Sequence, residues 1–457
     1  MSILTDVDGC GTLVDMTLVD LTRPPATSDR LTGLPVAIIG AGPIGLAAAA
    51  NLVERGIDFV IYEAGDTIAH SVRRWGHVRL FSPWKHLVDP ASRRLLEASG
   101  WEPPADDELP TGAELVERYL EPLAALGSLA PRIRTGVEVT AVARDGMDRT
   151  RTAHRSGTPF LLRLSEAGEV VEVGEVTARA VVDASGTYRT PNSLASSGLE
   201  PIGFADVAEL VAPALPDVLG RERARFAGRR TTVVGAGHSA ANTLIELARL
   251  AEAEPGTRIT WLIRNASATR VTTSADDELT ARASLGVRVD ALIASGVVEV
   301  LDRFEIVRLA RDGDAVRITG GRAGELVEHD TDLVVNATGF RPNLDMLREV
   351  RLELDEIVEA PRRLAPLIDP NVHSCGTVAP HGFAELQQPE SGFFLAGMKS
   401  YGRAPTFLLA TGYEQVRSIT AWLAGDAAAA AKVELVLPAT GVCSSSAGGA
   451  AASGCCA

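Results

Sequence analysis

Two glycine-rich turns have the spacing of phosphate-binding loops. The first, at residues 40–45, reads G-A-G-P-I-G and follows an apolar run at 35–39; the second, at 235–240, reads G-A-G-H-S-A and follows 231–234. Where a strand turns into a helix in this way, backbone N–H groups and the positive end of the helix dipole face a pyrophosphate. Two such turns indicate two dinucleotides in one chain, the arrangement that hydride transfer from a nicotinamide to a flavin requires.

The residues that end the next strands distinguish the two turns. Glu63 follows the expected strand 58–62, where a carboxylate accepts hydrogen bonds from ribose hydroxyls and repels a 2′-phosphate. Arg264 ends the expected strand 258–263, where a guanidinium suits a phosphate. We therefore predict FAD at the first turn and NADPH at the second. NADH stays as the alternative, because arginine is the usual cation of this chain.

Length and charge limit the class of protein. A chain of 457 residues predicts two to three domains, and a net charge of −15 argues against nucleic acid or an anionic membrane surface as a partner. Residues 36–53 carry no charge, but glycines and Pro43 interrupt them, so we expect a nucleotide-binding turn and no membrane span. Residues 1–33 lack an early basic cluster, which favours a flexible leader over a signal peptide and predicts a cytoplasmic protein.

A buried strand followed by a turn of small residues occurs twice, at 180–186 and at 333–340. This repeat predicts an α/β fold with two Rossmann-like dinucleotide-binding domains, each of the three-layer ββα type. The NADP domain is expected to be inserted in the FAD domain. We expect a leader at 1–33, the FAD domain at 34–227 and 333–437, the NADP domain at 228–332 and a disordered tail at 438–457. Hairpin strands are expected at 160–164 with 169–173 and at 297–319, a last strand at 392–397, and a helix from about Pro405 to 423.

These motifs together resemble the flavin-containing monooxygenase group of two-dinucleotide-binding-domain flavoproteins, over about residues 34–425. The layout is also similar to that of flavoproteins encoded with arsenic-resistance genes. The resemblance implies FAD contacts at Gly40, Gly42, Gly45, Glu63, Val139, Gly186, Gly397, Met398 and Thr406, and NADPH contacts at Gly235, Gly237, Ser239, Ala240, Arg264, Thr338 and Gly339. The N-terminus of the helix near Pro405 would face the flavin and stabilise its anionic reduced form.

The implied reaction is an NADPH-dependent monooxygenation in which a C4a-hydroperoxyflavin, formed with dioxygen, oxidises a small soft nucleophile. Two departures from the family bear on the oxygenation step. Residues 191–225 contain no clear match to its Phe-x-Gly turn followed by a histidine, and Met398 and Lys399 follow Gly397 where an aspartate is common. The alternatives are a reductase of a disulfide or a thiol-bound soft metal, and a non-catalytic redox or metal sensor that contains FAD.

Two further segments are candidates for the active site. The loop 368–376 and His381 lead into the last expected strand, so Cys375, His373 and His381 are candidate catalytic residues; an ordinary loop is the alternative. Residues 71–84 are rich in arginine, histidine and tryptophan. Arg73 and Trp75 are expected to cover the isoalloxazine ring, unless this segment is a solvated loop.

Three of the five cysteines, Cys443, Cys455 and Cys456, lie in a tail rich in alanine, glycine and serine. Adjacent thiols suit a soft ion such as As(III) or Hg(II), and the ending resembles the vicinal cysteine tail of mercuric reductase. The inner cysteine pair of that enzyme is missing, since residues 65–80 contain no cysteine. A tail without function is the alternative. A trivalent arsenical held by these thiols is the substrate that would unite tail and flavin, and the sequence is compatible with a homodimer.

Overall fold

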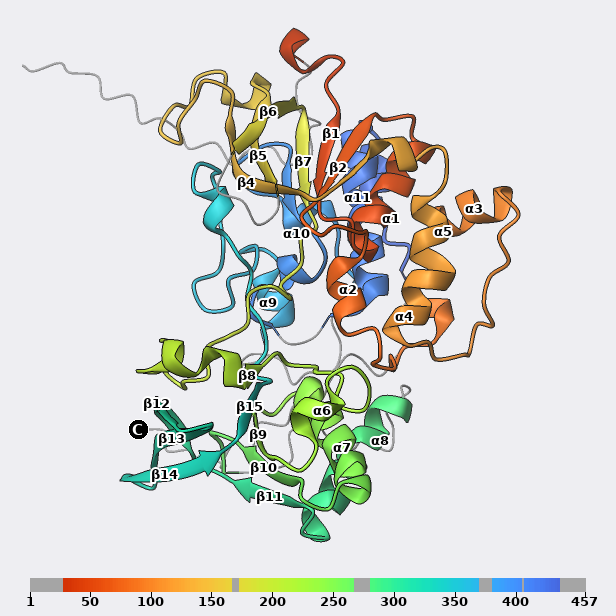
Figure 1. The fold of residues 1–457 in the computed structure, drawn as a ribbon. Helices are drawn as coiled ribbons and strands as arrows, with labels where there is room; N and C mark the ends of the chain where they lie inside the picture. Colours follow the sequence, from red (N-terminus) through yellow and green to blue (C-terminus); the bar gives the residue numbers. More distant parts are fainter. Residues whose placement is uncertain (1–27, 167–171, 267–279, 370–379, 405–406, 436–457) are drawn as a thin grey trace, which may run out of the picture.

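The computed structural model describes residues 28–166, 172–266, 280–369, 380–404 and 407–435. Two domains lie one above the other, each built around a five-stranded parallel sheet (Figure 1). The sheet of the first domain has the strand order β16-β7-β1-β2-β3. Its strands are β16 (Phe393–Leu395), β7 (Ala180–Asp183), β1 (Val36–Ile39), β2 (Phe59–Glu63) and β3 (Ile133–Thr135).

The first domain has the expected three layers, because alternate residues of β1 point to opposite faces. Val36 and Ile38 pack on helices α1 (Pro43–Glu54) and α11 (Leu409–Leu423). Ala37 and Ile39 pack on an antiparallel sheet of β4 (Val137–Arg144), β5 (Phe160–Glu166) and β6 (Glu172–Ala178). A sheet buried on both faces explains why its strands read as continuous apolar runs.

Short helices between β2 and β3 extend the helical layer of the first domain. They are α2 (His70–Arg74), α3 (Pro90–Ala98), α4 (Gly112–Leu115) and α5 (Glu121–Ala124), with a π-helical turn at Val116–Leu120. Leu96, Leu115 and Tyr119 are buried here against α1 and α11. Later in the chain, α9 (Ala365–Ile368), α10 (Phe383–Leu386) and α12 (Ala427–Ala431) complete this domain.

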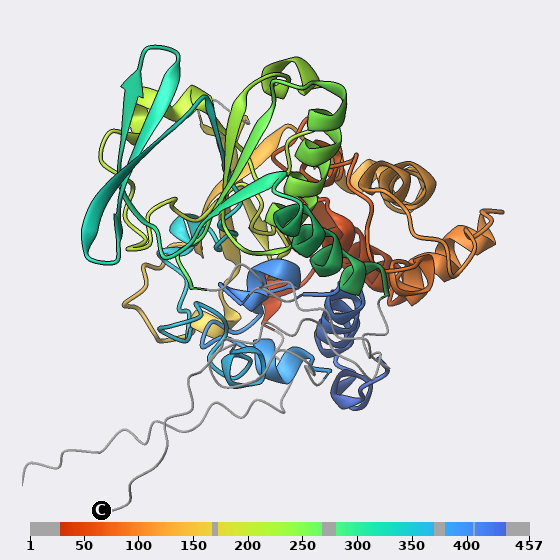
Figure 2. The ribbon, with the colours of Figure 1, turned by 90° about the horizontal axis from the view of Figure 1, so that it is seen from below.

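The second domain has the sheet order β11-β10-β9-β15-β8. These strands are β11 (Val298–Leu301), β10 (Arg258–Leu262), β9 (Arg230–Val234), β15 (Leu333–Asn336) and β8 (Val211–Ala212). Helices α7 (His238–Ala253) and α8 (Thr280–Ala294) cover one face (Figure 2). The antiparallel strands β12 (Glu305–Asp312), β13 (Ala315–Arg322) and β14 (Glu325–Thr331) cover the other, and the short helix α6 (Arg223–Phe226) precedes β9.

Three expectations need correction. Strands β8 and β15 pair within the second sheet, so this domain takes in more of the chain than 228–332. The segment at 297–301 is not a hairpin strand, because β11 pairs in parallel with β10. Helix α11 begins at Leu409 and not near Pro405, with Leu408 as its N-cap. No helix in the described ranges is long and apolar enough to span a bilayer; residues 36–53 form β1, the glycine turn and α1.

Candidate functional site

The first glycine turn lies between β1 and α1, and each of its glycines has a different role. A Cβ atom on Gly40 would come within 2.8 Å of the Ala184 carbonyl oxygen, and one on Gly45 within 1.9 Å of the Gly40 carbonyl oxygen, so both are needed for packing. A Cβ on Gly42 would meet no atom within 4 Å. Gly42 is also the N-cap of α1 and has no side chain to cap it, so an anion can approach the amides of the helix N-terminus.

Glu63 ends β2 beside this turn, as the sequence predicts. Its two carboxylate oxygens accept hydrogen bonds from the backbone amides of Ala41 at 2.7 Å and Gly65 at 2.8 Å. Each carboxylate oxygen has a further lone pair, so the side chain can still accept from a ribose hydroxyl. Glu63 therefore fixes the turn as well as lying where a ribose is expected.

The second glycine turn repeats this design between β9 and α7. A Cβ on Gly235 would come within 2.1 Å of the Ala337 carbonyl oxygen, whereas one on Gly237 would meet nothing within 4 Å. Gly237 is the uncapped N-cap of α7; Ser239 is half-buried in the first turn of this helix, and Ala240 is fully buried. The structure thus presents two open helix N-termini, one in each domain, at the positions predicted for the two pyrophosphates.

Arg264 follows β10 and its side chain is exposed. The neighbouring Trp261 indole donates to the Gly235 carbonyl at 2.5 Å, which ties the end of β10 to the second turn. On the other side of that turn, the Thr338 hydroxyl donates to Asn336 at 2.6 Å, and Gly339 has a φ of +97°. Thr338 therefore lies next to the second turn, and Arg264 follows the strand that Trp261 ties to this turn; the NADPH contacts of Arg264, Thr338 and Gly339 stay predictions.

A buried ion pair that the sequence analysis did not predict lies at the carboxyl end of the first sheet. Lys399 Nζ lies 2.6 Å from Asp183 Oδ2, and the two side chains are 1% and 0% exposed. The same ammonium donates to Ser185 Oγ at 3.0 Å, and the Ser185 hydroxyl donates to Asp183 Oδ1 at 2.7 Å. Lys399 follows β16 and Asp183 ends β7, so strand pairing brings together residues 216 positions apart.

A second buried network surrounds Gly397, which has a φ of +68°. The Gly397 amide donates to Gln415 Oε1 at 2.8 Å, and Gln415 Nε2 lies 2.9 Å from both His381 Nε2 and Ser400 Oγ. Because an amide nitrogen only donates, the imidazole nitrogen that faces Gln415 accepts this hydrogen bond. The proton of the neutral imidazole is then on the other ring nitrogen. His381 is 2% exposed. It therefore supports Gly397 from the protein interior, and direct contact with a substrate does not fit this burial.

The other predicted FAD contacts are distributed over three places. Val139 packs in the core between the two sheets of the first domain. Gly186 has a φ of +70°, and a Cβ atom there would meet no other atom within 4 Å. Met398, which follows Gly397, is half-buried. Arg73 pairs with Glu121 at 2.6 Å, and Gly112 lies against the Trp75 ring, so both side chains contact the helical region at 112–121. The remaining predicted residues lie outside the described ranges: His373, Cys375, Thr406, Cys443, Cys455 and Cys456.

The segment after α2 contacts the second domain. The Phe81 and His238 rings lie 5.7 Å apart, and His238 is the first residue of α7. Further along this helix, Glu246 Oε2 lies 3.9 Å from His77 Nε2. Burial, reinforced by the charge of Asp217, raises the pKa of Glu246 to about 7, and burial lowers the pKa of His77. The helix that begins at the second turn therefore approaches the first domain at two places, through the ring contact of His238 with Phe81 and at the half-buried Glu246 beside His77.

Within the described residues, no group of three or more histidine, aspartate or glutamate side chains is arranged to hold a metal ion. All five cysteines lie outside the described ranges. The tail thiols thus stay a prediction.

Comparison with known proteins gives the family. The family model "Pyridine nucleotide-disulphide oxidoreductase" matches residues 37–154 and 169–374, so the chain belongs to this family. The rice indole-3-pyruvate monooxygenase YUCCA1 is 29% identical over 252 residues, which are 54% of this chain and 52% of that protein. The chain thus aligns with about half the length of this curated relative.

Solved structures share the fold. The bacillithiol disulfide reductase of Bacillus cereus has a TM-score of 0.62 at 20% identity, covering 86% of this chain and 99% of that one. The ornithine N-hydroxylase of Kutzneria sp. 744 has a TM-score of 0.56 at 18% identity, with coverages of 86% and 99%. The expected fold class and the expectation of an FAD- and NADPH-dependent oxidoreductase are confirmed at the level of the family.

Proposed function

We propose that this member of the pyridine nucleotide-disulphide oxidoreductase family is an NADPH-dependent FAD monooxygenase that oxidises a small soft nucleophile with dioxygen. One observation carries the proposal: two open glycine turns, each at the N-terminus of a helix, in a chain without any C-x-x-C pair. A disulfide reductase that relays electrons through a dithiol needs two cysteines close together beside the flavin, and outside the tail the sequence contains only Cys10 and Cys375. The likeness to a plant monooxygenase supports the same choice.

The chain contributes binding and orientation. The amides at Gly42 and the N-terminus of α1 would hold the FAD pyrophosphate, and Glu63 would bind the ribose. The amides at Gly237 and the N-terminus of α7 would hold the NADPH pyrophosphate, and Arg264 its 2′-phosphate. When bound, FAD supplies the redox chemistry with NADPH and dioxygen, so no acidic or basic side chain is required at the substrate.

The substrate class follows from this cofactor set and from the tail. A weak electrophilic oxygen donor suits a soft nucleophile such as a sulfide or a trivalent arsenical. Cys443, Cys455 and Cys456 would supply thiolates, the ligands that a soft ion such as As(III) prefers. We therefore propose a trivalent arsenical as the first substrate to test, held by the tail while it is oxidised.

The test compares the consumption of NADPH and dioxygen with product formation and peroxide release, in the FAD-loaded full chain. A monooxygenase gives one product per NADPH and per dioxygen in the presence of arsenite or an organic sulfide, with little peroxide. Turnover that needs a disulfide and disappears in Cys375→Ser would instead support the reductase. If the FAD-loaded chain does not oxidise NADPH at all, the non-catalytic FAD-containing sensor is the function that remains.

Two sets of variants test the residue assignments. Arg264→Ala should raise the KM for NADPH about tenfold while leaving that for NADH almost unchanged, because a charge-assisted hydrogen bond to the 2′-phosphate is lost. Arg258→Ala, an exposed arginine at the opposite end of the same strand, is the control. Cys455→Ser/Cys456→Ser should abolish arsenite oxidation and spare sulfide oxidation; unchanged arsenite turnover would refute the role of the tail.

A further inference from the structure

The two domains contain the same turn after equivalent strands, with different chemistry. After β15, Asn336 Oδ1 accepts from the hydroxyl of Thr338 at 2.6 Å and from its amide at 3.3 Å. After β7, Asp183 Oδ1 accepts from the hydroxyl of Ser185 at 2.7 Å and from its amide at 3.2 Å. A neutral asparagine is therefore sufficient to form this turn.

The first domain nevertheless uses a carboxylate, which is costly. Asp183 is completely buried, and a buried carboxylate destabilises a protein by several kcal/mol unless it is paired. Lys399 supplies the pairing charge and is itself buried. In the second domain, the described residues place no lysine or arginine within hydrogen-bond distance of Asn336 or Thr338. The ion pair is thus an addition to the turn, and turn geometry does not account for it.

The ion pair also lies at a particular place. Ser185, whose hydroxyl contacts both charged side chains, is exposed, and its Cα would lie 2.9 Å from a Cβ on Gly40. The buried ion pair therefore lies on the interior side of the first glycine turn. Of Asp183, Lys399 and Ser185, only Ser185 is exposed there.

The hydrogen bonds fix what Ser185 can offer to a ligand. A serine hydroxyl has one proton to donate and two lone pairs. The proton goes to Asp183, and one lone pair is taken by the Lys399 ammonium. One lone pair is left, so Ser185 can accept a hydrogen bond but cannot donate one. A phosphate oxygen, which only accepts, gains nothing from this group.

We propose that Lys399 and Asp183 orient the Ser185 hydroxyl as an acceptor for a hydroxyl or N–H group of FAD at the first dinucleotide-binding turn. Lys399 and Asp183 are then positioning residues, and Ser185 is the contact. The inference rests on the proposed assignment of FAD to this turn.

The experiment measures the Kd of the apoprotein for FAD, the visible absorption bands of bound FAD and the melting temperature of the apoprotein. Ser185→Ala removes the acceptor and leaves the ion pair, so FAD affinity should fall about three- to tenfold, while the apoprotein stays folded and melts at a lower temperature because two hydrogen bonds to buried charges are lost. Ser185→Thr keeps the hydroxyl and should restore affinity. Ser295→Ala, at an exposed serine after α8, is the control.

The double variant Asp183→Asn/Lys399→Met separates positioning from structure, because it copies the neutral turn of the second domain. It should melt close to the wild type, bind FAD about three- to tenfold more weakly and shift the flavin absorption bands. Wild-type affinity and spectra in both this variant and Ser185→Ala would refute the inference while FAD binding itself persists. A folded wild-type chain that binds no FAD would overturn the proposed function as well.

Discussion

The carboxyl group of Glu246 makes the stability of this protein depend on pH in an unusual direction. Glu246 lies on α7 at the contact with the first domain, and its pKa is raised from 4.5 to about 7 by burial and by Asp217. A carboxyl whose pKa is higher in the folded state binds its proton more tightly there. Its contribution to stability is therefore greatest below pH 4.5, falls as the pH rises to about 7 and is constant above that.

The magnitude follows from the two pKa values. Each pKa step of one corresponds to about 1.4 kcal/mol, so ionisation of Glu246 costs the folded state about 3 kcal/mol at pH 8. Glu246→Gln keeps the size of the side chain and removes the ionisation. The variant should gain about 2–3 kcal/mol over the wild type between pH 5 and pH 8. For domains of about 150–250 residues this corresponds to about 5–10 °C in melting temperature.

The assay is thermal unfolding of the wild type and the variant at pH 5, 6, 7 and 8. Glu252→Gln, an exposed carboxylate on the same helix, is the matched control and should follow the wild type at every pH. Other titrating groups are common to all three proteins, so the difference between curves reports Glu246 alone. Parallel curves for the wild type and Glu246→Gln would refute the reasoning.

Three further predictions concern other parts of the structure. Burial raises the pKa of Asp89 to about 6, so Asp89→Asn, which can still cap α3, should gain about 2 kcal/mol over the wild type between pH 4 and pH 7 in denaturant titrations. Glu390→Ala should lower the free energy of unfolding by about 3–5 kcal/mol, since Arg144 and Arg155 both pair with this buried carboxylate at 2.8 Å; a loss below 1 kcal/mol would contradict this. Gly42→Val should leave the melting temperature of the apoprotein unchanged and weaken FAD binding at least tenfold, whereas Gly45→Ala should impair folding; equal effects on both properties would contradict the separate roles of these glycines.

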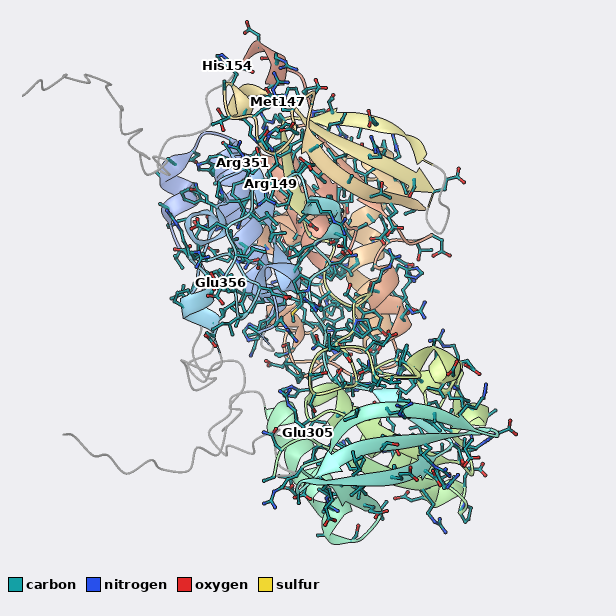
Figure 3. The ribbon with its side chains drawn as sticks, turned by 90° about the vertical axis from the view of Figure 1, so that its left-hand side faces the viewer. Met147, Arg149, His154, Glu305, Arg351 and Glu356 are labelled. Atoms are coloured by element: carbon teal, nitrogen blue, oxygen red, sulfur yellow. The ribbon has the colours of Figure 1, made fainter. Side chains whose placement is uncertain are left out.

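The Glu390 network shows how the first domain is held together around its last strands. Burial alone would raise the pKa of Glu390, but hydrogen bonds from Arg155 and Arg144 outweigh it and hold the pKa below its ordinary value. Arg351 donates its amide to the same carboxylate at 3.2 Å and its guanidinium Nε to the Arg149 carbonyl at 2.9 Å, so Arg149 and Arg351 lie together on the surface (Figure 3). The segment before β16 is thereby attached to the loop between β4 and β5.

Local patterns in the sequence were sufficient for the glycine turns and the strands that precede them. An apolar run, a G-x-G and a helix are contiguous in the chain, so β1, α1, β9 and α7 could be predicted without knowing their neighbours. Strand β8 could not, because it has two residues and becomes a strand only by pairing with β15. The parallel pairing of β11 was missed for the same reason: sequence spacing suggested a hairpin, while its partner β10 precedes it by a whole helix.

The residues of the candidate site fall into the same two groups, those that the local sequence reveals and those that only the fold brings together. Residues of the turns themselves, such as Gly42 and Gly237, could be assigned from spacing. The Lys399–Asp183 pair could not, since each residue alone is an ordinary charge in the sequence and only the pairing of β16 with β7 brings them into contact. For His381, the fold adds contacts that its place in the sequence does not reveal. Its place in the loop before the last strand suggested a catalytic residue, but the fold places it behind Gly397, in contact with Gln415.

The difference between the two repeated turns fits the different demands on the two nucleotides. FAD has to stay bound through many turnovers, whereas NADP has to leave for NADPH to enter. A buried ion pair holds its neighbours in one geometry, because displacing either partner exposes an unpaired charge to the protein interior. If FAD binds at the first turn as proposed, this rigidity would pre-organise Ser185 and reduce the entropy that FAD binding must overcome. At the second turn Asn336 and Thr338 contact the Asn192 carbonyl oxygen at 2.9 and 3.1 Å, and a rearrangement of these neutral groups would leave no unpaired buried charge.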